Sequence, residues 1–201
     1  MIRALITDFG GVLVRTRTDR SRRVLEERLG LPPNTLENRV FGGELSLQGQ
    51  HGFISEEAFW QGVARELDVA RIGLTPETFR AEFFADDFLD EELMALIRSV
   101  RPRLKTGLIS NAWSGMRDLI HTAVPIADAF DALVISAEEK MMKPDPRIYQ
   151  LALDRLQVRA EEAIFLDDMP VNIQACTALG MRGVHFTSSE QAQRDIRALL
   201  D

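Results

Sequence analysis

Five short apolar runs, separated by longer stretches with helical periodicity, constrain the fold of this 201-residue chain most strongly. The runs are IRALIT (2–7), LKTGLIS (104–110), ALVIS (132–136), AIFLD (163–167) and GVHF (183–186). Strands that alternate with helices along a chain are typical of a parallel sheet covered by helices. The runs are almost wholly apolar, as expected of strands buried on both faces. We therefore expect an α/β fold, with a Rossmann-like parallel sheet and helices on both of its faces.

One long segment, between the first and second apolar runs, breaks this alternation. It shows no convincing strand, and loop signals such as LPPN and GLTPE separate its helical patterns, which include SRRVLEERLG (21–30) and SEEAFWQGVARELDV (55–69). We predict that residues 15–89 form a small helical cap inserted into a Rossmann-like catalytic core. That core comprises residues 1–14 and 90–201.

Composition restricts the classes of function open to the chain. Its 24 basic and 31 acidic side chains give a net charge of −7, whereas a general nucleic-acid binder normally shows a basic excess. No apolar run approaches the roughly 18–20 residues that a membrane span needs. The single cysteine, Cys176, cannot form an internal disulfide, so we expect a buried thiol in a reducing compartment. These features favour a cytoplasmic protein that binds neither nucleic acid nor membranes.

Polar side chains stand at the ends of three of the five apolar runs. They are Asp8 after the first run, Ser110 and Asn111 at the second, and Asp167 and Asp168 at the fourth. Ligands of open parallel sheets bind just beyond the carboxyl ends of the strands. We therefore predict that these side chains form one functional site at that edge of the sheet.

Carboxylates at two strand ends indicate a hard cation bound through oxygen. Magnesium is usually held by one or two carboxylates together with water and a substrate phosphate. The three histidines, His51, His121 and His185, are scattered and lack the spacing of zinc ligands. We therefore predict a Mg²⁺ site, and structural or solvated roles for the histidines.

A lysine is expected at the same edge of the sheet. Lys143 opens the motif KPDPRIY, in which Pro144 favours an extended backbone at the lysine. Asp145 can cap the following helix, and Pro146 can occupy its first position. Because this context fixes its loop, we favour Lys143 over the neighbouring Lys140 as the functional lysine.

A carboxylate, a divalent cation and an ammonium group together suit attack on a phosphate ester. The two positive charges offset the repulsion between the carboxylate and the phosphate dianion, and they stabilise the charge that is transferred. Covalent catalysis through an aspartyl-phosphate would divide the reaction into two steps. Asp8-Phe9-Gly10 also matches the metal-binding tripeptide of protein kinases. We do not expect a kinase, because that tripeptide normally follows a glycine-rich loop and a catalytic loop, and here it begins at residue 8.

Four motifs in this order resemble the haloacid dehalogenase-like hydrolase superfamily, in the branch with a helical cap inserted after the first strand. They are DFGGVL (8–13), LISNAW (108–113), KPDPRIY (143–149) and FLDDMPVNIQAC (165–176). The resemblance covers nearly the whole chain and implies a Mg²⁺-dependent phosphomonoester hydrolase. Its substrate would be a small phosphorylated metabolite, such as a sugar phosphate, selected by the cap.

The resemblance also implies which residues hold the metal. Asp8 would be both the nucleophile and a metal ligand, and Gly10 would offer its backbone carbonyl. Asp168 would be the second carboxylate ligand, with Asp167 beside it in the first or second shell of the metal. Asn172, one helical turn later, would hydrogen-bond within this acidic cluster.

For the phosphoryl group, the resemblance implies three further residues. Ser110 and Asn111 would hold the transferring group. Lys143 would pair both with the phosphate and with the nucleophile Asp8, which makes it a catalytic as well as a phosphate-binding residue.

One position departs from the family pattern. Phosphatases of this superfamily usually carry a second aspartate two residues after the nucleophile, as general acid and base, and Gly10 stands there. Loss of such a group typically costs about 10²–10⁴-fold in rate. This glycine leaves open a non-catalytic phosphate-binding or regulatory protein on the same scaffold. A 2-haloacid dehalogenase is a lesser alternative, because its metal-free chemistry has no use for Asp167 and Asp168 together.

Two segments of the predicted cap have features of a substrate-facing surface. The arginine-rich segment RTRTDRSRR (15–23) can steer an anionic substrate, or it can form a solvated helix face. The segment QGQHGF (48–53) is a candidate substrate-facing loop. Phe53, Phe59 and Trp60 are expected in the hydrophobic core of the cap.

Overall fold

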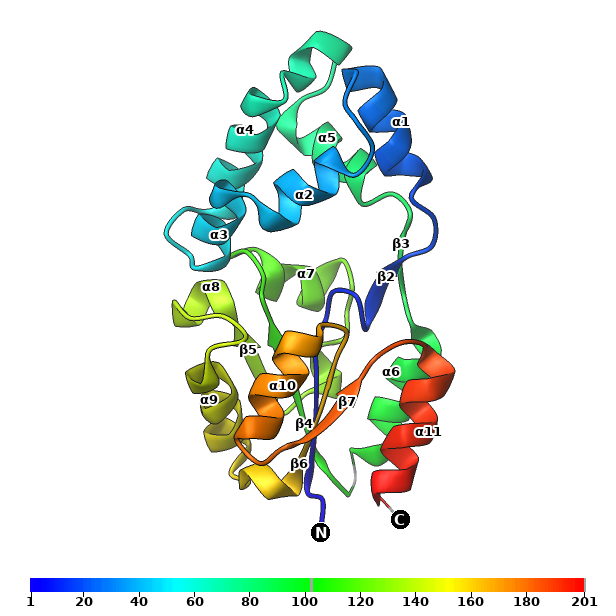
Figure 1. Ribbon diagram of the computed structural model, residues 1–201, viewed down its shortest axis with the longest axis vertical. Coiled ribbons are helices and arrows are strands. Elements are labelled where there is room, and N and C mark those ends of the chain that lie inside the picture. Colours follow the sequence, from blue (N-terminus) through cyan, green and yellow to red (C-terminus); the bar gives the residue numbers. More distant parts are fainter. Residues whose placement is uncertain (102, 201) are drawn as a thin grey trace.

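The computed structural model describes residues 1–101 and 103–200, and within these ranges a five-stranded parallel sheet forms the centre of the larger part of the molecule (Figure 1). In spatial order the strands are β5 (Ala132–Ile135), β4 (Lys105–Ser110), β1 (Ala4–Thr7), β6 (Ala163–Asp167) and β7 (Arg182–His185). All four neighbouring pairs are parallel. The predicted α/β class is confirmed, and the ends of each strand lie within two residues of the ends of an apolar run. Pro102 and Asp201, which belong to the predicted core, lie outside the described residues.

The order of the strands reverses direction at β1. The chain runs from β1 through β4 to β5 on one side, and then returns to β6 and β7 on the other. Thr7 of β1 is therefore in register with Leu108 of β4 and with Leu166 of β6. In open α/β sheets the ligand site lies beyond the carboxyl ends of the strands at such a switch point.

Helices cover both faces of the sheet, as predicted. On one face lie α9 (Pro146–Leu156) and α10 (Pro170–Ala178); on the other lie α6 (Glu91–Val100), α7 (Met116–Thr122) and α11 (Ser189–Leu200). Ile148, Ala152 and Leu156 of α9 recur at helical spacing and pack with Ile6 of β1. Within the ranges described, no helix is long and apolar enough to cross a lipid bilayer.

The segment between β1 and α6, here called the insertion (residues 15–89), is mainly helical and lies at the end of the molecule away from both termini (Figure 1). Its helices are α1 (Arg20–Leu29), α2 (Thr35–Gly42), α3 (Glu44–Gln50), α4 (Glu56–Glu66) and α5 (Pro76–Phe83). They enclose a hydrophobic cluster that contains Phe59 and Trp60, as predicted. Phe53 was also expected in this cluster, but its side chain is exposed on the loop that follows α3.

A short two-stranded ribbon joins the insertion to the sheet. β2 (Val14–Thr16) pairs antiparallel with β3 (Asp87–Leu89), so the two connections run side by side. The expectation of no strand between Val14 and Leu89 is therefore wrong at both ends of the segment. Strands of three residues carry too little periodicity to be read from sequence, and their pairing partners lie about seventy residues apart.

Asp90 fixes the point where this ribbon meets the sheet domain. Its carboxylate accepts a hydrogen bond from the Leu93 amide at 3.0 Å and so caps α6. It also pairs with the Arg15 guanidinium at 2.6 Å and accepts a hydrogen bond from the Ser189 hydroxyl at 3.1 Å. Because Asp90 is buried, one carboxylate ties the ribbon, α6 and α11 together.

We expect Asp90→Ala to lower the free energy of unfolding by about 2–3 kcal/mol, because it removes a helix cap and leaves Arg15 without its partner. Asp90→Asn keeps the capping oxygen and should lose only about 1 kcal/mol. Urea denaturation of the two variants measures both values. Equal stability of Asp90→Ala and the unmodified chain would contradict this role.

Candidate active site

The carboxyl ends of β1, β4 and β6 bring the predicted residues to one edge of the sheet. Asp8 follows β1 directly, Ser110 is the last residue of β4, and Asp167 is the last residue of β6. The Asp8 amide donates to the Leu166 carbonyl at 2.9 Å, which places the two aspartates on neighbouring strands. All three polar side chains are buried.

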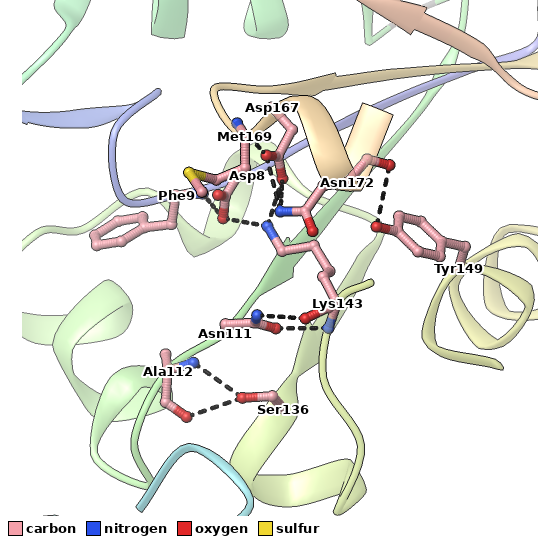
Figure 2. A network of polar contacts seen from close by, with 10 residues as sticks. All are labelled: Asp8, Phe9, Asn111, Ala112, Ser136, Lys143, Tyr149, Asp167, Met169 and Asn172. Carbon is pink, nitrogen blue, oxygen red and sulfur yellow. Dashed lines mark hydrogen bonds and ion pairs between the residues drawn. The ribbon is translucent and has the colours of Figure 1, made fainter. Parts of the chain in front are cut away.

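The ammonium of Lys143 lies between two of these carboxylates (Figure 2). Its Nζ is 2.8 Å from Asp8 Oδ1 and 2.7 Å from Asp167 Oδ2, and the side chain is almost completely buried. The predicted support of its loop is present, since Asp145 caps α9 by accepting from the Arg147 amide. Lys140 lies outside this cluster, and its ammonium contacts the Gly52 carbonyl of the insertion.

Asn111 holds the backbone of Lys143. Its Nδ2 donates to the Lys143 carbonyl at 2.9 Å, and its Oδ1 accepts from the Lys143 amide at 2.8 Å (Figure 2). Both ends of the side-chain amide are therefore engaged with main chain. Asn111 thus positions the lysine in this structure, whereas Ser110 stands buried at the end of β4.

Asp167 is completely buried, and its oxygens are surrounded by donors. Asn172 Nδ2 donates to Oδ1 at 2.9 Å and to Oδ2 at 3.1 Å, and the Met169 amide donates to Oδ1 at 2.8 Å. The predicted hydrogen bonding of Asn172 within the acidic cluster is confirmed. The Tyr149 hydroxyl in turn donates to the Asn172 carbonyl at 3.2 Å, a contact that the sequence did not reveal.

Three carboxylates converge at this edge. Among the described residues, Asp8, Asp167 and Asp168 each offer an oxygen, and these oxygens lie within 4.8 Å of one another. Gly11 permits this approach, because it has φ +77° and a Cβ at that position would lie 2.4 Å from Asp168 Oδ2. At Gly10, by contrast, a Cβ would meet no atom within 4 Å.

Burial dominates the electrostatics of the site. It raises the pKa of Asp8 to about 7, although the Lys143 ammonium opposes the shift. Burial, and then the charge of Asp167, raises the pKa of Asp168. Burial would lower the pKa of Lys143, but the charges of Asp8 and Asp167 outweigh it and raise that pKa. The raised pKa values of Asp8 and Asp168 mean that full ionisation of the carboxylates around this one lysine is unfavourable without a further positive charge.

This need for a further positive charge, together with an all-oxygen donor set, fits a hard divalent cation. When all three carboxylates are ionised against Lys143, the charge of these four groups is −3 + 1 = −2. A divalent cation has the matching charge and prefers carboxylate oxygens. Asp8, Asp167 and Asp168 are the side chains that could hold it.

Two arginines of segment 15–23 make ion pairs at the ribbon. Arg15 pairs with Asp90, and buried Arg22 pairs with Asp87 at 3.2 Å and with Glu37 at 3.2 Å. Sequence alone could not separate this structural role from substrate steering, because two of the acidic partners lie more than sixty residues away.

Comparison with known proteins now gives the family. A family model described as haloacid dehalogenase-like hydrolase matches residues 2–180, and the chain belongs to this family of hydrolases. Phosphatase MT3486 of Mycobacterium tuberculosis is 29% identical over 98% of this chain and 95% of its own length. Bifunctional epoxide hydrolase 2 of the pig is 27% identical over 97% of this chain, which spans only 38% of that protein.

The solved structures agree with the fold. A family enzyme from Bacteroides thetaiotaomicron, crystallised with magnesium and inorganic phosphate, has a TM-score of 0.77 with 22% sequence identity. The match covers 94% of this chain and 96% of that one.

We expect Asp8→Asn to stabilise the chelator-treated protein at pH 8 by about 1–2 kcal/mol. A pKa raised to about 7 means that folded Asp8 holds its proton more tightly than unfolded Asp8, so stability falls as pH rises from 4 to 7. The gain should shrink at pH 5, where Asp8 is largely neutral. Urea denaturation at both pH values measures it, with exposed Asp68→Asn as the control. An equal gain at the two pH values would contradict the raised pKa.

Proposed function

We propose that this hydrolase is a Mg²⁺-dependent phosphomonoester hydrolase that acts in the cytoplasm on a small phosphorylated metabolite. The observation that carries the proposal is the buried ion pair of Asp8 with Lys143, next to the carboxylates of Asp167 and Asp168. Two further findings support it: a relative that matches nearly the whole chain is a phosphatase, and a protein of the same fold binds magnesium and phosphate.

Asp8 is oriented for nucleophilic attack. The Phe9 amide and the Lys143 ammonium both contact Oδ1, at 2.7 and 2.8 Å. These contacts hold the carboxylate while Oδ2 remains the oxygen that can attack phosphorus. The bond from phosphorus to the leaving oxygen then breaks, and an aspartyl-phosphate forms on Asp8. Water attacks this phosphorus in the second step and releases inorganic phosphate and the free carboxylate.

Lys143 supplies positive charge for the reaction, and a cation held by the metal ligands would supply more. Lys143 offsets the negative charge of Asp8 and of the incoming phosphate. Asp8, Asp168 and the backbone carbonyl of Gly10 would hold Mg²⁺, with Asp167 beside them. When bound, the cation would neutralise charge on the phosphoryl oxygens. Ser110 is proposed to hydrogen-bond the phosphoryl group. Asn111 is proposed to help hold the same group by positioning Lys143.

We further propose that residues 15–89 act as a cap over a core of residues 1–14 and 90–201. The ribbon of β2 and β3 supplies two adjacent connections, which is the arrangement that a moving lid needs. The cap would exclude water and select the leaving group of the substrate, a sugar phosphate being one example.

We expect the protein to release phosphate from members of a broad phosphomonoester panel at neutral pH in the presence of Mg²⁺. Chelator should abolish the release, and Asp8→Asn should lower it by at least about 10³-fold, because the nucleophile is lost. A colorimetric phosphate assay measures both effects. Phosphate binding without release from any compound would instead favour the regulatory scaffold, and metal-independent release of halide from 2-haloacids would favour the dehalogenase.

Gly10 generates a second prediction for the same assay. A side chain fits there, because its Cβ meets open space and its φ lies outside the left-handed region. Gly10→Asp should therefore raise kcat by up to about 10²-fold for substrates with poor leaving groups, because it supplies a general acid. Gly11→Asp, whose Cβ would clash with Asp168, is the control and should lose activity. No gain from Gly10→Asp on any substrate would show that protonation of the leaving group is not limiting.

A further inference from the structure

One buried hydroxyl connects the insertion to the catalytic loops. Ser136 follows β5 and is completely buried. Its Oγ is 3.0 Å from the Ala112 amide, which donates to it, and 2.7 Å from the Gln50 carbonyl of α3. A serine hydroxyl has one proton to donate, so the shorter contact makes Gln50 the acceptor. The hydroxyl therefore bridges the insertion and the loop after β4.

The contact completes the hydrogen bonding of α3. The last four carbonyls of a helix have no partner within the helix. In α3, those of Leu47, Gln48 and Gly49 accept from the amides of His51, Phe53 and Gly52. The fourth, Gln50, accepts from Ser136. A residue of the sheet domain thus caps a helix of the insertion, so the hydrogen bond forms only when the insertion is seated.

From Ser136 a series of hydrogen bonds and main-chain links leads to the nucleophile. Ala112 adjoins Asn111, whose side chain holds both backbone groups of Lys143. Lys143 then pairs with Asp8. Figure 2 shows this series from Ser136 through Ala112, Asn111 and Lys143 to Asp8. The position of α3 is therefore linked, through the loop that carries Asn111, to the backbone of the residue whose ammonium contacts Asp8.

We infer that Ser136 is a positioning residue that couples seating of the insertion to placement of Lys143. When α3 is seated, the hydroxyl donates to Gln50 and accepts from Ala112, which fixes the loop that carries Asn111. When α3 moves away, the hydroxyl can turn to the Ala112 carbonyl, at 3.2 Å, and the hold on the loop changes. This inference rests on the proposed phosphatase activity, which it deepens.

The chain offers a matched control in Ser114. Its hydroxyl accepts from the Glu56 amide at 3.2 Å, so it also joins the insertion to the same loop region. It makes this contact at the surface, and within the described residues its side chain forms no hydrogen bond with Ala112. Ser114→Ala therefore removes a contact to the insertion and leaves the series from Ser136 to Lys143 intact.

The test compares kcat and KM of Ser136→Ala and Ser114→Ala on the best substrate of the panel. Ser136→Ala should lower kcat about tenfold, with KM changed little, because the displaced ammonium acts mainly in the transition state. Ser114→Ala should change either constant by no more than roughly twofold. In the background of Asn111→Ala, Ser136→Ala should add less than about twofold, because the series is already broken. Equal effects of the two serine variants, or independent effects of Ser136 and Asn111, would overturn the inference.

Two additions keep the test decisive. Ser136→Cys preserves the size of the side chain with weaker hydrogen bonding, and it should give an intermediate kcat if Ser136→Ala does not fold. Calorimetric titration in Mg²⁺ with orthovanadate, a mimic of the phosphoryl group in the transition state, requires no turnover, and there Ser136→Ala should weaken binding about tenfold while Ser114→Ala does not. A wild-type protein that binds vanadate but releases no phosphate from any compound would refute the proposed function alone. Unaltered vanadate binding by Ser136→Ala would refute the coupling.

Discussion

The buried ammonium of Lys143 is the interaction on which the arrangement of the site depends. Asp8 and Asp167 end neighbouring parallel strands, so the fold itself brings two carboxylates together away from water. Without a cation between them, burial and mutual repulsion would keep at least one carboxylate protonated. An ammonium removed from water is itself costly unless it is paired and hydrogen-bonded. Lys143 and Asp167 therefore stabilise each other, whereas Asp8 adds a second contact to the same ammonium although burial disfavours its own ionised form.

The loops around the sheet serve to hold that lysine in place. Its ammonium is fixed by two carboxylates, and its backbone by both ends of the Asn111 amide. The carboxylate of Asp167 is held in turn by the side chain of Asn172, and the backbone carbonyl of Asn172 accepts a hydrogen bond from Tyr149 on α9. Residues from the ends of three strands and from two helices therefore define one position for Nζ. With the insertion seated, a phosphate bound there would meet a charge that is already in place, which is the condition for electrostatic catalysis.

Much of this arrangement could be predicted from local patterns. The apolar runs predicted the positions of the strands. The polar residues at the ends of these runs predicted that Asp8, Ser110 and Asp167 lie together, because the carboxyl ends of parallel strands meet at one edge of a sheet. Contacts between distant segments could not be predicted in this way. The three-residue strands β2 and β3, and the hydrogen bond from Ser136 to Gln50, depend on partners about seventy and eighty-six residues away. Ser136 itself ends an apolar run, so its place at the end of a strand could be predicted, but its hydrogen bond to Gln50 could not.

The two adjacent glycines of the first motif, Gly10 and Gly11, are present for different physical reasons. Gly11 is required by geometry, because its positive φ and its contact with Asp168 exclude a side chain. Gly10 is under neither constraint, so nothing in the backbone or the packing accounts for the absence of an acid there. The explanation must then come from the chemistry. In the proposed reaction, with no carboxyl group at residue 10, the leaving oxygen would take its proton from water or from a hydroxyl of the substrate, which would favour substrates with good leaving groups.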